Sequence, residues 1–161
     1  MLGIASKLLQ SWSIPKRPQV VMHVDNSAHY KIDTDDGAEE FSKLLPSGGH
    51  TIHLMDEKGV PSTYTVSMFH QLRCLDILRQ EYIIEPPQPP SRLSEHCMNY
   101  LRQMFWCHPN LRLESMRYPP YIENHAPAGA TTQGYDTLCH DWRAVYEEAE
   151  GNFDAFMLLT S

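Results

Sequence analysis

The chain has 161 residues, 42% of them hydrophobic, which is enough for one domain with a core of its own. Its net charge of −7 argues against a nucleic-acid partner, because phosphate recognition requires clustered Lys and Arg. No apolar run reaches the roughly 18 residues of a membrane span, and the amphipathic first residues lack the core of a secretory signal. We therefore expect one soluble domain over residues 1–161, cytoplasmic by default, with residues 1–19 as an N-terminal extension or arm.

Short strands are predicted in the first half of the chain. The apolar residues 20–24 indicate one strand, and the alternating residues 50–55 and 63–66 indicate two more that are joined by a turn. Between them, residues 38–45 predict a short helix.

Two longer helices follow. Apolar residues at helical spacing predict the first from residue 64 or 65 to Tyr82. The proline-rich residues 85–90 then form a stiff connector. Ser91 is a suitable N-cap for the second helix, over residues 92–107.

The last third of the chain begins with few apolar periodicities. Residues 108–134 predict an extended arm or loop, residues 136–150 predict a last helix, and the apolar residues 153–159 are expected to dock on the core. The expected fold class is therefore mainly α with a small β element (α+β). It comprises two motif-bearing helices and a C-terminal helix, joined by long proline-rich connections.

A seven-residue pattern occurs twice, once in each long helix. Residues 74–80 read CLDILRQ, and residues 97–103 read CMNYLRQ. His70 lies one helical turn before Cys74, and His96 directly precedes Cys97. The repeat therefore predicts two similar helices that present His and Cys side chains in related positions, and we expect the functional centre there.

The first interpretation of this centre is a metal site. Imidazoles from neighbouring helices commonly hold copper, iron or zinc, often together with a thiolate or a carboxylate. His70 and His96 are the best pair, with Cys74, Cys97 and Asp76 as further candidates. Two histidines alone are a small ligand set.

Two other interpretations remain open. One is acid–base chemistry without a metal, performed by either histidine with the help of Arg73 or Tyr100. The other is purely structural, with the cysteines and histidines in the core and with Arg79 and Arg102 bound to carboxylates.

The four cysteines allow three pairings, and no CxxC motif indicates a zinc ribbon or a redox pair. Without a signal peptide, free thiols in a reducing compartment are the default expectation. The other histidines lie in strands, turns, loops or helix ends, where exposed imidazoles are common, and are weaker candidates: His23, His29, His50, His53, His108, His125 and His140.

These motifs resemble the UstYa-like family of fungal secondary-metabolite biosynthesis proteins. The resemblance rests on residues 67–76, reading SMFHQLRCLD, on residues 96–103 with Cys107, and on residues 139–142, reading CHDW. It covers roughly residues 20–150. It implies an enzyme that modifies a peptide or polyketide-like intermediate, by oxidative cyclisation or another oxidation, with copper as the metal. It also allows a homodimer or a heterodimer with related proteins.

Both copies depart from the family's H-x-x-H-C motif. Arg73 replaces the second histidine of the first copy, and Leu93 replaces the first histidine of the second copy. Asn110 stands where the family has Asp. Half of the implied imidazole ligands are therefore replaced, and a guanidinium at position 73 would repel a nearby cation.

We therefore carry three hypotheses. The first is an oxidoreductase with a metal at His70 and His96. The second is a metal-independent cyclase or isomerase that uses one of these histidines as the acid or base and Arg73 to stabilise an oxyanion. The third is a non-catalytic partner of an active relative.

Overall fold

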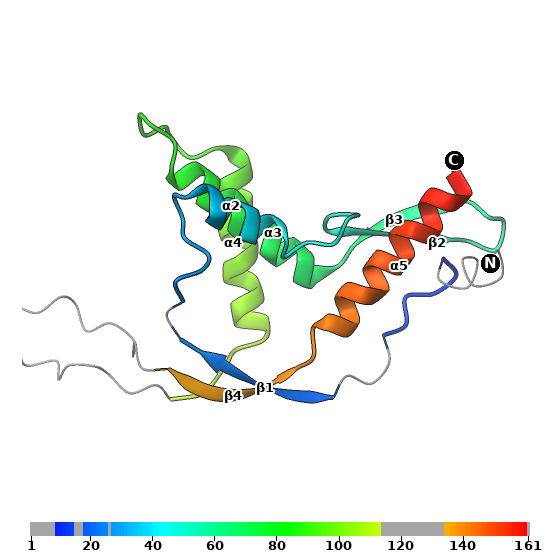
Figure 1. The fold of residues 1–161 in the computed structure, drawn as a ribbon. Coiled ribbons are helices and arrows are strands. Elements are labelled where there is room, and N and C mark those ends of the chain that lie inside the picture. Colours follow the sequence, from blue (N-terminus) through cyan, green and yellow to red (C-terminus); the bar gives the residue numbers. More distant parts are fainter. Residues whose placement is uncertain (1–8, 15–17, 26, 114–133, 161) are drawn as a thin grey trace, which may run out of the picture.

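The computed structural model describes residues 9–14, 18–25, 27–113 and 134–160. Within these residues the chain forms four helices and two antiparallel sheets of two strands each (Figure 1). The predicted class, mainly α with a small β element, is confirmed. The elements in chain order are β1 (Gln19–Val24), α2 (Asp35–Ser42), β2 (Thr51–Met55), β3 (Pro61–Thr65), α3 (Ser67–Tyr82), α4 (Arg92–Cys107), β4 (Tyr135–His140) and α5 (Arg143–Thr160).

The β2–β3 hairpin confirms the two strands predicted on either side of a turn. Its register pairs Thr51 with Thr65 and Met55 with Pro61. The side chain of Asp56 closes the turn by accepting hydrogen bonds from two backbone N–H groups within it. Because the backbone stays extended to Thr65, α3 begins at Ser67, slightly later than its periodicity predicted.

Strand β4 corrects the predicted last helix, which was expected to start at residue 136. Residues 135–140 instead pair with β1, with Val24 opposite Tyr135 and Gln19 opposite His140. Their exposure alternates along the strand, as expected for a ribbon with one covered face. Helix α5 then extends to Thr160, so the apolar residues 153–159 are the last turns of this helix. They contact the rest of the molecule as expected, since Ala155 is buried and Phe156 stacks on His53.

Helix starts follow their caps. Ser91 caps α4 as predicted, because its hydroxyl accepts a hydrogen bond from the Ser94 N–H at 3.1 Å. Helix α2 begins before the predicted residue 38, because the Thr34 hydroxyl accepts from the Gly37 N–H. Residues 108–113 have no regular secondary structure, and residues 114–133 of the predicted arm lie outside the described residues.

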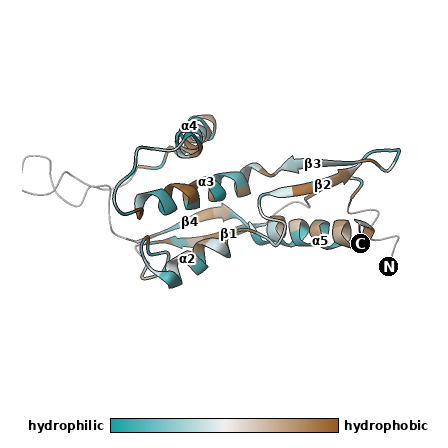
Figure 2. Cartoon of the chain, turned by 90° about the horizontal axis from the view of Figure 1, so that it is seen from above, coloured by the Kyte–Doolittle hydropathy of each residue, from teal (hydrophilic) through white to brown (hydrophobic). Residues whose placement is uncertain are grey.

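The core lies where α3 and α5 meet the β2–β3 hairpin. Its buried centre consists of Ile52, Phe69, Val145 and Ala149. Part of the expected N-terminal arm also packs here, since Leu9 is buried and Trp12 and Ile14 contact the core. Helix α3 lies between α4 on one side and α2 with the β1–β4 ribbon on the other (Figure 2). Across the described part of the chain, no helix is both long enough and apolar enough to span a membrane.

Candidate functional site

Helices α3 and α4 form a helical hairpin whose axes cross, since α4 is seen end-on where α3 is seen from the side (Figure 2). A disulfide joins the two helices near the middle of each. The bond links Cys74 to Cys97, with their Cα atoms 4.9 Å apart, and both cysteines are buried. The rings of His70 and Tyr100 meet on one side of this bond. The repeated pattern therefore brings its two cysteines together.

Three aromatic rings meet between the two helices. The imidazole of His70 stacks on the ring of Tyr100, with centroids 4.0 Å apart and planes inclined by 23°. The His96 ring lies 5.6 Å from His70 and 6.2 Å from Tyr100. Because His96 and Tyr100 are one turn apart on α4, both rings can contact the single His70 ring of α3, and the three centroids form a triangle. We call His70, His96 and Tyr100 the ring cluster.

A fourth ring, that of His50, also lies next to the cluster, although the sequence made His50 a weak candidate. The His50 ring centroid lies 6.0 Å from that of His70. The reason is the hairpin register, because Thr51 pairs with Thr65 and the Val66 N–H donates to the His50 carbonyl. His50 is therefore bonded to Val66, the residue one helical turn before His70. The predicted hairpin could have placed His50 near His70, but only if the exact pairing of its two strands had been known.

Burial and neighbouring charge both act on His70. Desolvation lowers the pKa of His70, and the imidazoles of His96 and His50 lower it further. A lowered pKa leaves His70 neutral at pH 7, with a nitrogen lone pair that can accept a proton. The site residue best suited to acid–base chemistry is thus His70.

The predicted Arg73 and Asp76 belong to a separate polar network on α3. The buried Asp76 carboxylate accepts from Arg79 Nε at 2.9 Å, from Gln80 at 2.7 Å and from Arg73 at 3.4 Å. Arg79 also donates to the Ile32 carbonyl, which ties α3 to the segment before α2. The structural interpretation of Arg79 therefore fits. Arg102, by contrast, lies 4.5 Å from the Trp106 ring centroid instead of binding a carboxylate.

The disulfide corrects the expectations for Cys74 and Cys97. We expected free thiols by default and thiolate ligands in the metal hypothesis, but disulfide sulfurs are not thiolates. Cys107 and Cys139 are free. Among the described residues, no three His, Cys, Asp or Glu side chains are arranged to hold a metal ion. His70 and His96 are therefore an incomplete ligand set, since metal sites commonly use three or four protein ligands.

The remaining predicted histidines lie outside the ring cluster. His23 pairs with Asp136 at 2.7 Å, His29 pairs with Glu40 at 2.5 Å, and His53 stacks on Phe156. His108 and His140 are exposed, and His125 lies outside the described residues.

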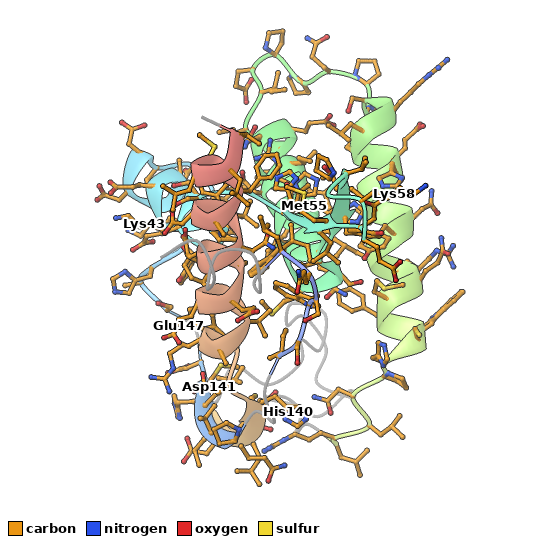
Figure 3. The ribbon with its side chains drawn as sticks, turned by 90° about the vertical axis from the view of Figure 1, so that its right-hand side faces the viewer. Lys43, Met55, Lys58, His140, Asp141 and Glu147 are labelled. Atoms are coloured by element: carbon orange, nitrogen blue, oxygen red, sulfur yellow. A yellow bond between two sulfur atoms is a disulfide. The ribbon has the colours of Figure 1, made fainter. Side chains whose placement is uncertain are left out.

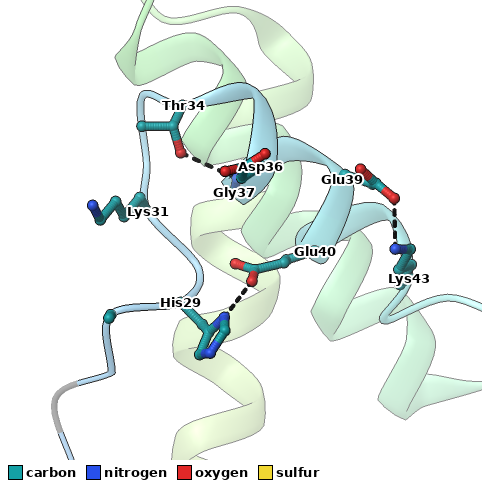
Figure 4. A pocket seen from close by; sticks show the side chains of 9 residues that line it. His29, Lys31, Thr34, Asp36, Gly37, Glu39, Glu40 and Lys43 are labelled. Atoms are coloured by element: carbon teal, nitrogen blue, oxygen red, sulfur yellow. Dashed lines mark hydrogen bonds and ion pairs between the residues drawn. The ribbon is translucent and has the colours of Figure 1, made fainter.

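The cavities on the described residues are lined by side chains outside the ring cluster. A polar cavity of about 390 Å³ lies beside α2, and the ion pairs of His29 with Glu40 and of Lys43 with Glu39 cross its wall (Figure 4). An apolar cavity of about 440 Å³ is lined by Trp12, Tyr64 and Met68, among others. Neither cavity is lined by a predicted site residue, so the ring cluster remains the candidate site.

Comparison with known proteins assigns the chain to a family. Residues 46–152, about two thirds of the chain, match the family model described as "Mycotoxin biosynthesis protein UstYa". The chain belongs to the UstYa family. The matched residues include His50, the hairpin with the ring cluster and its disulfide, whereas the polar cavity beside α2 lies outside them.

Two curated relatives in the UstYa family are similar to the chain. It is 30% identical over 123 residues to "UstYa family oxidase phomYb" of Diaporthe leptostromiformis, a match that covers 67% of this chain and 47% of the relative. It is 32% identical over 91 residues to "Oxidase ustYa" of Aspergillus flavus, covering 54% of this chain and 40% of that protein. The matches thus span less than half the length of these UstYa-family relatives. No solved structure matches the chain.

Proposed function

We propose that this chain performs an oxidative step of fungal mycotoxin biosynthesis on a peptide or polyketide-like intermediate, at the ring cluster. The observation that carries the proposal is the stack of His70 on Tyr100 beside His96, inside a hairpin fixed by a disulfide. Membership of the UstYa family and the word "oxidase" in the names of both relatives support the reaction type.

The chain's own contribution to such a step is proton transfer and positioning. Oxidation removes two electrons and two protons from the substrate, and an oxidase passes the electrons to dioxygen. The neutral His70 imidazole accepts a proton, and the stacked Tyr100 ring fixes the plane of that imidazole. His96 is exposed, so substrate can approach the cluster from its side.

Copper at His70 and His96 forms part of the proposal, although these residues are an incomplete ligand set. We therefore route no reaction step through it. The direct measurement is metal content by mass spectrometry on purified wild-type protein and on a His70→Ala/His96→Ala variant. Stoichiometric copper that the variant loses supports the metal. A folded wild-type protein that stays empty after incubation with copper refutes it.

A redox-neutral reaction is the second candidate, and the lowered pKa of His70 favours it. A neutral imidazole next to a substrate C–H or O–H group needs no metal to act as a base. In this mechanism the cluster would close a ring or isomerise the substrate. Arg73, the oxyanion-stabilising group of this hypothesis, would have to turn from its contact with Asp76 toward the substrate. In a third version the chain only binds and stabilises an active relative.

Metabolite masses in the producing fungus distinguish the three versions. The native gene is replaced by the His70→Ala/His96→Ala variant, and extracts are compared by liquid chromatography and mass spectrometry. An accumulated precursor that is two hydrogens heavier or one oxygen lighter than the product supports oxidation. A precursor of the same mass as the product supports the cyclase or isomerase. Unchanged product supports the non-catalytic partner and refutes both enzymes.

A matched control uses histidines outside the cluster. His23→Ala/His29→Ala also removes two imidazoles, but both are exposed and far from the α3–α4 hairpin in sequence. We expect this control to leave the product unchanged. Circular dichroism of both purified double variants checks that each is folded.

A further inference from the structure

Among the described elements, α3 is the only one that α4 contacts extensively. It lies at the margin of the molecule, and side chains project from its outer side (Figure 3). That side carries large apolar groups, since Met98 is 59% exposed, Phe105 is 67% exposed and Trp106 is 73% exposed. Such a concentration on one helix typically marks an interface.

Four outer residues of α4 follow the spacing of a helix–helix seam. Glu95, Met98, Arg102 and Phe105 are separated by three, four and three positions, so they share one stripe along the helix. The apolar surface continues onto α3, because Leu78 and Tyr82 line a cavity of about 690 Å³ together with Met98. We call these four α4 residues the outer stripe.

The outer stripe carries two opposite charges, two helical turns apart. Glu95 lies at the end near the connector, and no described residue forms an ion pair with its carboxylate. Arg102 lies two turns further along and stacks on Trp106. In an isologous contact, residue i of one copy meets residue j of the other, and j meets i. If two α4 helices pack antiparallel and cross near Met98, Glu95 of each copy therefore meets Arg102 of the other.

We propose that a second copy of this chain docks on the outer stripe, so that the two α4 helices pack antiparallel across a two-fold axis. The net charge of −7 and the glutamate in the stripe disfavour an anionic membrane as the occupant. His96 and Tyr100 lie about 160° around α4 from the stripe. The dimer therefore leaves the ring cluster open, and the proposal is independent of the reaction catalysed there.

Analytical ultracentrifugation of the full chain tests the dimer up to about 100 μM. We expect a dimer for the wild type and a monomer for Phe105→Glu, which buries a charge in the seam. Glu95→Arg and Arg102→Glu each place like charges together, and we expect each to raise the dimer Kd by at least about tenfold. The double variant Glu95→Arg/Arg102→Glu restores both pairs, and its Kd should return to within about threefold of the wild type.

A substitution elsewhere serves as the matched control. Val21 on β1 is 67% exposed, the same fraction as Phe105, and Val21→Glu should leave the Kd unchanged. Circular dichroism checks the folding of every variant. The proposal is overturned by a wild type that is monomeric at about 100 μM, whether or not it sediments with phosphatidylserine vesicles. It is equally overturned by a dimer that Phe105→Glu does not weaken, or whose affinity the charge-swapped double variant does not recover.

Discussion

At the scale of single residues, Asn152 on α5 takes the place of a strand neighbour for β2. Its side-chain oxygen accepts from the His53 N–H at 2.8 Å, and its amide nitrogen donates to the His53 carbonyl at 2.7 Å. Both backbone groups point to the edge of β2 that β3 does not cover. One buried amide thus satisfies a donor and an acceptor that the two-stranded sheet leaves open.

We expect Asn152→Ala to lower the free energy of unfolding by about 1–3 kcal/mol, because it leaves both His53 backbone groups without these partners. Urea denaturation measures the change. Asn99→Ala is the matched control, since the Asn99 amide is exposed and bonds only within α4. Its effect should stay below about 0.5 kcal/mol. Equal losses in the two variants would show that Asn152 does not support β2.

The second residue-scale prediction concerns His70. Because its pKa in the folded protein is lowered, the unfolded chain binds more protons at mildly acidic pH. The stability that depends on neutral His70 is therefore fully present above the ordinary histidine pKa of about 6.5 and is lost as the pH falls through the folded value. Burial lowers the pKa of His53 as well, so His70 accounts for only part of the slope.

Thermal melts between about pH 7.5 and pH 5 test this assignment. Over that pH range, the melting temperature of His70→Gln should fall less than that of the wild type. In the wild type, NMR titration should place the His70 midpoint below about 6.5. His96→Gln should raise that midpoint, because it removes a neighbouring positive charge at low pH. An unmoved midpoint would contradict the coupling between the two rings.

At the scale of elements, the disulfide is what holds α4 against α3 at a fixed register. The bond closes a loop with a sequence separation of 23 residues. A loop of that size corresponds to about 3 kcal/mol of stabilisation through the unfolded state. The bond also lies within one turn of His70 and next to His96, so it sets the spacing of the ring cluster.

Thiol titration of the denatured, unreduced chain should find the two free thiols of Cys107 and Cys139, and reduction should raise the number to the total of four cysteines. Cys74→Ser/Cys97→Ser should lose about 3 kcal/mol of stability. The same variant should shift the pKa of His70 back toward its ordinary value, as the cluster loosens. Cys107→Ser is the control and should change neither quantity. Four reactive thiols before reduction would refute the bond.

Local patterns predicted the two long helices and their pairing, whereas non-local contacts corrected the rest. The repeat of His and Cys placed His70 and His96 near each other because helical spacing is a local property. Strand β4 was missed because its partner β1 lies at the other end of the chain, and a helical reading of residues 136–150 competed with it. His50 was underrated because its neighbour depends on hairpin register. The disulfide was one of three pairings that composition alone left equal.

At the scale of the whole molecule, burial is distributed unevenly. Phe69, Val145 and Ala149 place the core between α3, α5 and β2, and the buried Arg79–Asp76 pair adds a polar contact in the later turns of α3. The β1–β4 ribbon has only two strands, and Val21 and Leu138 remain exposed opposite each other. Isolated two-stranded ribbons are marginally stable in water.

Amide hydrogen exchange should therefore distinguish a slowly exchanging core from a rapidly exchanging ribbon. We expect the amides of α3, β2 and the central turns of α5 to exchange most slowly, through global unfolding, and those of the β1–β4 ribbon to exchange much faster, through local opening. Mass spectrometry of peptic fragments measures both. Reduction of the disulfide should accelerate exchange in α4 and leave the ribbon unchanged, because α4 is held by α3 and the ribbon is not. A ribbon as protected as the core would mean that another surface covers it in solution.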